Sequence, residues 1–93
     1  MHDWPLLSIS VEWEAGRVEL TFKTHARGLV SLLAEGVTEL HVPRQQPWGP
    51  SDCVNKVKGP SATNGGLQTL EIQMRSGDCI RIVAVSFQMP AKI

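Results

Sequence analysis

Apolar and polar residues alternate on both sides of a glycine turn in the stretch from 67 to 85. Strict period-2 alternation around a turn is typical of a half-buried β-hairpin. A three-residue loop that ends at Gly77, with this glycine in the left-handed conformation, keeps the apolar side chains on one face. The cross-strand pairs predicted by this register are Leu70–Ile82, Glu71–Arg81 and Ile72–Ile80.

Shorter alternating stretches predict further strands earlier in the chain. These strands span residues 7–13, 18–23, 29–33, 37–42 and 52–58. The run 29–33 is also compatible with one helical turn, but the following Gly36 and β-branched Val37 favour a strand. Residues 59–66 predict a mobile loop and residues 86–93 a less ordered tail. About seven short strands separated by glycine or proline predict an all-β fold over residues 1–93. We expect a single-domain antiparallel β-sandwich or flattened barrel.

The side chains that alternate toward one face form the predicted core. They are Leu7, Ile9, Val11, Val18, Leu20, Phe22, Leu32, Leu40, Leu70, Ile72, Ile80 and Ile82. Trp4 and Trp13 are expected to pack in this core or along a sheet edge. Because the core is small, pairing of edge strands in a homodimer is a natural source of additional stability.

Composition and charge narrow the classes of partner. The chain of 93 residues carries nine basic and nine acidic side chains, so its formal net charge is zero. Nucleic-acid binders usually carry a basic surplus, and we therefore predict no nucleic-acid partner. No apolar run is long enough to span a bilayer, and the N-terminus does not resemble a secretory signal, which predicts a cytoplasmic protein without a membrane partner. Cys53 and Cys79 are then expected to be small buried thiols rather than a disulfide.

The residues that carry chemistry do not form a recognisable catalytic or metal-binding motif. His2, His25 and His41 lack the spacing of a zinc site, and no GxSxG sequence surrounds a serine. Asp78 is expected to bond the backbone of the hairpin turn near Gly77. The sequence therefore predicts a protein that is not an enzyme and that has neither a cofactor nor a metal.

The segment around Trp48 has the most unusual composition in the chain, because two prolines bracket a tryptophan and a glycine. Trp and Arg are enriched at the energetic centres of protein interfaces, so this turn is a candidate recognition patch. Alternatively, Trp48 folds back and caps one end of the sandwich. The candidate binding residues are Trp48, Arg44, Gln46, Asn55, Glu71, Gln73 and Arg81.

Two of these segments support a resemblance. Residues 47–51, PWGPS, and residues 71–78, EIQMRSGD, occur together with His2-Asp3 and a Gly36-Val37 step. In this combination the chain resembles a group of small bacterial proteins of similar length with no assigned activity. The resemblance covers most of the chain and implies a self-contained bacterial β domain, without implying a role for any residue.

The sequence therefore favours a non-enzymatic module that binds another protein, for example a bacterial immunity protein that acts as an antitoxin. Two alternatives stay open. One is a small-ligand binder that stacks a sugar-like or amino-acid-like molecule on Trp48, and the other is a structural homodimer joined through an edge strand.

Overall fold

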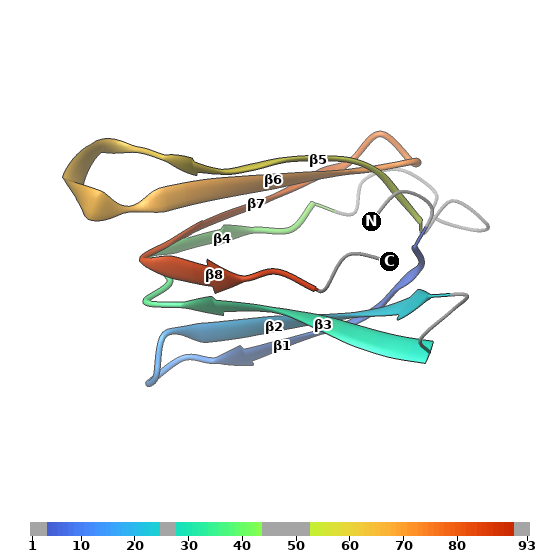
Figure 1. Ribbon diagram of the computed structural model, residues 1–93, viewed down its shortest axis with the longest axis horizontal. Coiled ribbons are helices and arrows are strands. Elements are labelled where there is room, and N and C mark those ends of the chain that lie inside the picture. The colour runs from blue at the N-terminus through green and yellow to red at the C-terminus, as the bar shows by residue number, and fades with distance from the viewer. Residues whose placement is uncertain (1–3, 25–27, 44–52, 91–93) are drawn as a thin grey trace.

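The computed structural model describes residues 4–24, 28–43 and 53–90. In this part of the chain, eight strands form two antiparallel four-stranded sheets that face each other, as Figure 1 shows. The first sheet has the order β1 (Leu6–Glu12), β2 (Arg17–Thr24), β3 (Gly28–Glu35) and β8 (Ser86–Gln88). The second has the order β4 (Glu39–His41), β7 (Cys79–Ala84), β6 (Gln68–Met74) and β5 (Val54–Ala62). A short 3-10 turn, η2 (Asn64–Gly66), precedes β6. The predicted all-β sandwich is confirmed.

The β6–β7 hairpin has the register predicted from the sequence, with the three predicted pairs all present. The N–H of Met74 donates to the carbonyl of Asp78 at 2.8 Å, and the N–H of Gly77 donates to the carbonyl of Met74 at 3.0 Å. Gly77 has a φ of 101°, which a side chain would disfavour. Asp78 is buried in the turn, where its N–H and carboxylate both contact the hydroxyl of Ser76.

The second sheet is a Greek key, because β5, β6 and β7 follow one another as hairpins while β4 lies beside β7.

The chain crosses between the sheets at residues 36–38 and again at Val85. Both crossings lie together at one end of the sandwich (Figure 1). The N–H of Val85 donates to the carbonyl of Glu35 at 3.0 Å, and the N–H of Thr38 donates to the carbonyl of Val83 at 2.8 Å. Gly36 has a φ of 67°, and a Cβ at this position would lie 2.6 Å from Cγ2 of Val85. The crossings can pack this closely only because residue 36 is glycine.

The core lies between the sheets and contains most of the residues predicted for it. The buried apolar residues are Leu6, Val18, Leu20, Phe22, Leu32, Ala34, Val54, Leu70, Ile72, Met74, Ile80, Ile82 and Ala84. Ile9 and Leu40 are partly buried against this cluster. The prediction was wrong for two residues, because Leu7 is 51% exposed and Val11 is 47% exposed.

The error in β1 has a local cause. The pairing of β1 with β2 slips between Leu6 and Ser8, so that Leu6 takes the inward position opposite Phe22. This bulge moves Leu7 out of the core, since one extra residue reverses the side to which the following side chains point. Val11 does lie on the core side, opposite Val18, but nothing from the other sheet covers it fully.

The two described tryptophans differ in environment. Trp4 packs against the core, with its ring centroid 6.3 Å from that of Phe22. Trp13 is 90% exposed, so the expectation that it packs in the core or along an edge was wrong. It follows the last residue of β1 and is the first residue of the β1–β2 turn.

Two segments expected to be irregular are strands. Strand β5 continues past residue 58 to Ala62, and a second bulge between Lys58 and Ser61 accommodates Gly59 and Pro60. Backbone pairing with β6 resumes beyond this bulge, which the composition of the segment did not indicate. The first part of the expected tail is β8, which pairs with β3 and completes the first sheet.

Candidate functional site

Four of the predicted binding residues lie in the second sheet. Glu71, Gln73 and Arg81 share its outer face, on the neighbouring strands β6 and β7, and Asn55 is exposed in a bulge of β5. The other three, Trp48, Arg44 and Gln46, fall outside the described residues. The structure therefore brings together the hairpin half of the predicted site.

The outer face of the second sheet carries a row of polar and charged side chains across all four strands. The register aligns Lys58, Glu71, Arg81 and His41 in this row. A shallow depression of about 200 Å³ lies beside the row and includes Lys56 and Cys79. In this row Lys58 and Arg81 flank the single carboxylate of Glu71.

Cys79 is not an activated thiol in this environment. Burial raises the pKa of the Cys79 thiol above its ordinary value, and the carboxylate of Glu71 raises it further. The charges of Lys58 and Arg81 lower the pKa but do not offset these effects. A thiol with a raised pKa is mostly protonated at neutral pH and reacts slowly.

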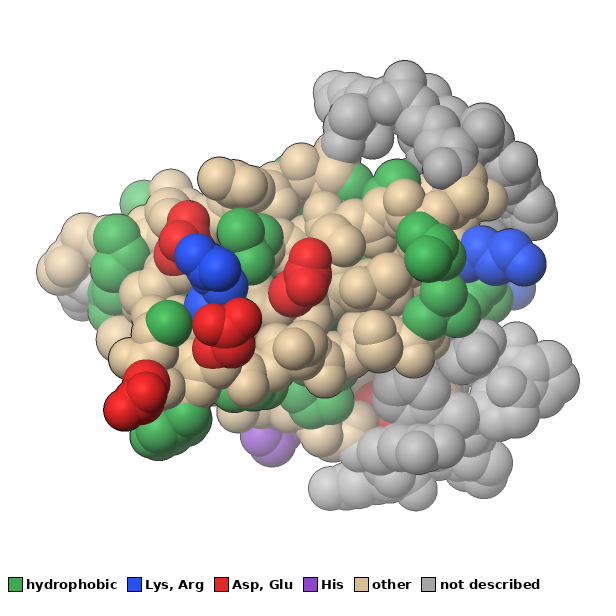
Figure 2. Space-filling view, turned by 90° about the horizontal axis from the view of Figure 1, so that it is seen from below, with side chains coloured by type: hydrophobic (Ala, Val, Ile, Leu, Met, Phe, Trp, Pro, Cys, Tyr) green, Lys and Arg blue, Asp and Glu red, His purple; other side chains and the backbone are tan. Residues whose placement is uncertain are grey.

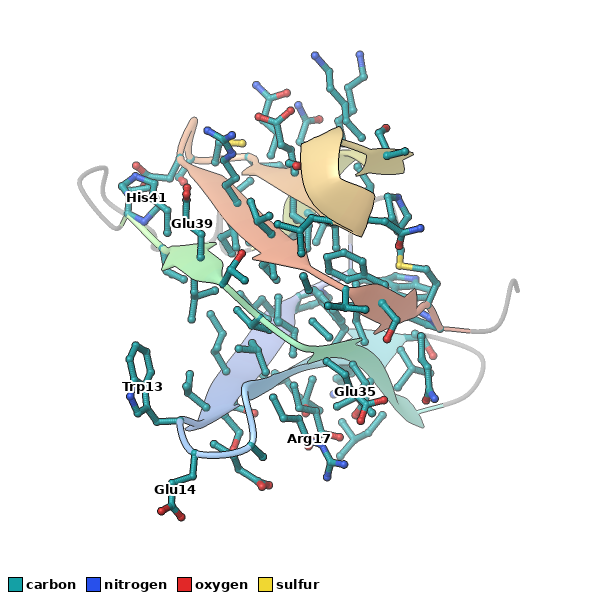
Figure 3. The ribbon with its side chains drawn as sticks, turned by 90° about the vertical axis from the view of Figure 1, so that its left-hand side faces the viewer. Trp13, Glu14, Arg17, Glu35, Glu39 and His41 are labelled. Carbon is teal, nitrogen blue, oxygen red and sulfur yellow. The ribbon has the colours of Figure 1, made fainter. Side chains whose placement is uncertain are left out.

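A groove opens on the side of the sandwich where β1 and β4 are the outermost strands. It has a volume of about 410 Å³. We call it the β1–β4 groove, and it is lined by Val11, Glu12, Trp13, Gly16, Arg17, Val18, Val37, Thr38, Glu39 and Leu40. Figure 3 shows Trp13 on one side of this opening and Glu39 and His41 on β4 on the other.

The two sides of the groove are tied together at one end. The N–H of Gly16 donates to the carbonyl of Trp13 at 3.2 Å and closes the β1–β2 turn. The N–H of Val37 then donates to the carbonyl of Gly16 at 2.8 Å. The backbone of the turn that carries Trp13 is thereby fixed to the crossing that leads into β4.

The groove exposes surface that belongs to the core side of the first sheet. Val11 pairs with Val18, which is almost fully buried, yet Val11 itself is 47% exposed. Val37 and Leu40 line the opposite side and are partly buried. The core therefore continues into the groove without being closed off.

Acidic side chains surround the groove. Glu12 is exposed on the β1 side and Glu39 on the β4 side, while Glu14 is exposed in the β1–β2 turn and does not line the groove. Arg17 contacts Glu35, with Nη2 and Oε2 3.4 Å apart. Figure 2 shows the outer face of the first sheet, where Asp and Glu side chains surround a Lys or Arg at one end. Figure 3 shows Arg17 and Glu35 pointing toward one another on this face.

This site was not predicted from the sequence, although one signal was present. Trp13 continues the apolar alternation of the first strand but stands immediately before the turn residues Glu14 to Gly16. Its exposure depends on where the other sheet ends, which the local pattern does not contain.

Within residues 4–24, 28–43 and 53–90, no three His, Cys, Asp or Glu side chains cluster as a metal site requires. The described part of the chain also contains no helix that is long and apolar enough to cross a membrane. Comparisons with protein-family models, curated protein sequences and solved structures found no match.

Proposed function

We propose that this chain is a protein-binding module whose contact surface is centred on the β1–β4 groove. The observation that carries the proposal is the position of Trp13, which is 90% exposed beside a groove with apolar sides. Large apolar side chains that are held in solvent next to a pocket are typical of interface hot spots. The bond between Gly16 and Val37 fixes the backbone of the Trp13 turn, so little backbone ordering is required on binding.

The charge around the groove favours a partner other than a second copy of the chain. In a two-fold dimer the same surface meets itself. Glu12 lies on one side of the groove and Glu39 on the other, so groove-to-groove contact would bring carboxylates together. Like charges placed opposite one another cost several kcal/mol in an interface. A partner with apolar and basic side chains would complement the same surface.

One specific form of this proposal is an immunity protein that binds and neutralises a toxin. A toxin that acts on nucleic acid needs basic side chains to contact phosphates. An acidic, partly apolar groove would cover such a surface. This form predicts that the partner is basic and loses its activity in the complex.

The proposal is tested by placing a photo-crosslinking amino acid at position 13 in cells that make the protein, with position 29 as the control. Leu29 is also exposed, at 65%, and lies at the opposite end of β3 from the groove. The partner crosslinked at position 13 is then identified, purified and titrated against Trp13→Ala and Leu29→Ala. Because loss of a hot-spot tryptophan costs about 2 kcal/mol or more, we expect Trp13→Ala to bind at least about 30-fold more weakly.

The same variants give the control for folding. Since Trp13 is exposed, Trp13→Ala should change the free energy of unfolding by no more than about 0.5 kcal/mol. If the partner binds both variants with the affinity of the parent, or crosslinks only at position 29, then the groove is not the contact surface.

A further inference from the structure

We infer that the partner contributes an extended strand that carries a basic residue beside Glu12 and pairs with the outer edge of β1, which pairs with no other strand among the described residues. This inference rests on the proposed function and specifies the chemistry of the segment that fills the groove. The segment would lie as an additional strand between β1 and β4, with alternate side chains directed into the groove. Strand addition of this kind obtains affinity from backbone hydrogen bonds and specificity from alternate side-chain positions.

Among the four edge strands, β1, β4, β5 and β8, β1 is the least protected against pairing with another chain. Strands β4 and β8 have three residues each, and Pro43 lies two residues beyond the end of β4. Strand β5 is bulged twice and contains Lys56, Lys58 and Pro60. Short length, bulges, lysine and proline all protect an edge from pairing with another chain. Strand β1 has seven residues, none of them Lys, Arg or Pro, and its bulge is confined to its first residues.

The side chains of β1 define what the added strand must present. Ile9 and Val11 lie on the core side of β1, because they pair with the buried Leu20 and Val18. An apolar residue beside Val11 would cover surface that is now exposed and would also reach toward Leu40 across the groove. On the outer side, β1 presents Ser8, Ser10 and Glu12. The partner strand should therefore alternate apolar with polar residues.

Charge specifies one of the polar positions. Glu12 is opposite Arg17 in β2, but the guanidinium of Arg17 contacts Glu35 instead. No ion pair within 4.0 Å is found for Glu12 or Glu14 among the described residues. A Lys or Arg on the added strand directly opposite Glu12 would form a favourable cross-strand pair. A second copy of β1 cannot supply it, since the sequence of β1 contains no basic residue.

The test uses two synthetic peptides that match β1 in length, at seven residues. The first is Lys-Val-Thr-Val-Thr-Val-Lys, with its valines on one face and its lysines on the other, and the second has glutamate in place of both lysines. Binding is measured from the anisotropy of a fluorophore on each peptide. We expect the lysine peptide to bind at least tenfold more tightly than the glutamate peptide at physiological ionic strength.

Charge reversal on the protein supplies the matched control. Glu12→Lys should reverse the preference between the two peptides. Glu19→Lys makes the same change of charge one strand further from the β1 edge, roughly 10 Å from the added strand, and should change the ratio of affinities less than threefold.

Backbone pairing is tested separately by N-methylation of the peptide. In an added strand, successive N–H groups point alternately toward β1 and away from it. Two versions of the lysine peptide are therefore compared, each methylated at one nitrogen, and the two methylated positions are adjacent. One version should lose binding, and the other should bind within threefold of the unmethylated peptide.

Equal binding of the two methylated peptides would refute strand pairing, and equal binding of the lysine and glutamate peptides would refute the role of Glu12. If neither peptide binds, the inference is overturned. The proposed function would still stand if the partner of the intact protein depends on Trp13.

Discussion

Gly36 is a position where the structure predicts a large effect of adding one carbon atom. Alanine at this position would have to adopt a φ of 67°, and its Cβ would lie 2.6 Å from Cγ2 and 2.8 Å from Cβ of Val85. Both crossings between the sheets meet here, so neither segment can move without disturbing the other. We expect Gly36→Ala to destabilise the fold strongly.

The magnitude has two parts. A non-glycine residue in the left-handed region costs about 1–2 kcal/mol. A contact of 2.6 Å is roughly 1 Å shorter than the optimal separation of two carbon atoms, and relieving such overpacking costs about 1–3 kcal/mol. The sum is about 2–5 kcal/mol. For a domain of this size, a loss of about 3 kcal/mol within this range corresponds to a fall in melting temperature of roughly 12–24 °C.

Gly28→Ala is the matched control. Gly28 has a φ of 70°, yet a Cβ there would meet nothing within 4 Å, so only the backbone cost applies. Urea unfolding followed by circular dichroism should give Gly36→Ala a loss about 2 kcal/mol larger than that of Gly28→Ala. In a Val85→Gly background, which removes both contacting atoms, the cost of Gly36→Ala should fall to that of the control.

If Gly36→Ala and Gly28→Ala lose the same free energy of unfolding within about 0.5 kcal/mol, then Val85 does not restrict residue 36. The steric account of the two crossings would then be wrong. The same conclusion would follow if Val85→Gly left the cost of Gly36→Ala unchanged.

The structure makes two further predictions that need only purified protein. Leu6→Ala should lower the free energy of unfolding in urea titrations by about 2 kcal/mol, because Leu6 is only 9% exposed. Leu7→Ala should lower it by no more than about 0.5 kcal/mol, because Leu7 is 51% exposed. The reverse order would show that β1 has no bulge. In a Cys53→Ser background, iodoacetamide should modify Cys79 slowly at pH 7.5. Glu71→Gln should speed the reaction, because removing a negative charge lowers the pKa of the Cys79 thiol and raises the thiolate fraction. An unchanged or slower rate would contradict the influence of Glu71 on this pKa.

The hairpin shows how much of this fold could be predicted from local sequence. Only one register agrees with the alternation of the hairpin, with the position of its glycine and with one face that is entirely apolar. This register predicted the pair Ile72–Ile80, which the structure contains. Gly77 adopts the left-handed conformation that this loop length requires. Here the local pattern and the tertiary environment select the same arrangement.

Strand β1 shows where that reasoning fails. Its alternation starting at Leu7 is as regular as that of the hairpin, but the bulge after Leu6 changes which side chain enters the core. A bulge is stabilised by the partner strand and the opposite sheet, and neither is encoded within the stretch itself. The groove was missed for the same reason, because the exposure of Val11 depends on where β4 lies.

Strand β8 is a third case. A three-residue segment carries too little alternation to predict a strand, and its pairing with β3 brings together parts of the chain that are far apart in sequence. The candidate residues of the hairpin were placed on one face correctly, because the register alone determines their positions. The Trp13 site required knowledge of both sheets.

The late position of β8 in the chain has a consequence for synthesis. Ala34 pairs with Phe87, which is 53 positions later, so the first sheet keeps an unpaired edge at β3 until that residue has been made. At ribosomal rates of about 5–20 residues per second, the delay is roughly 3–10 s. During this interval the nascent β1–β2–β3 meander presents Leu33, Ala34 and Glu35 on an open strand edge. We therefore expect chaperones that bind unfolded chains to protect this nascent chain for longer than they protect a sheet whose neighbouring strands are all consecutive in sequence.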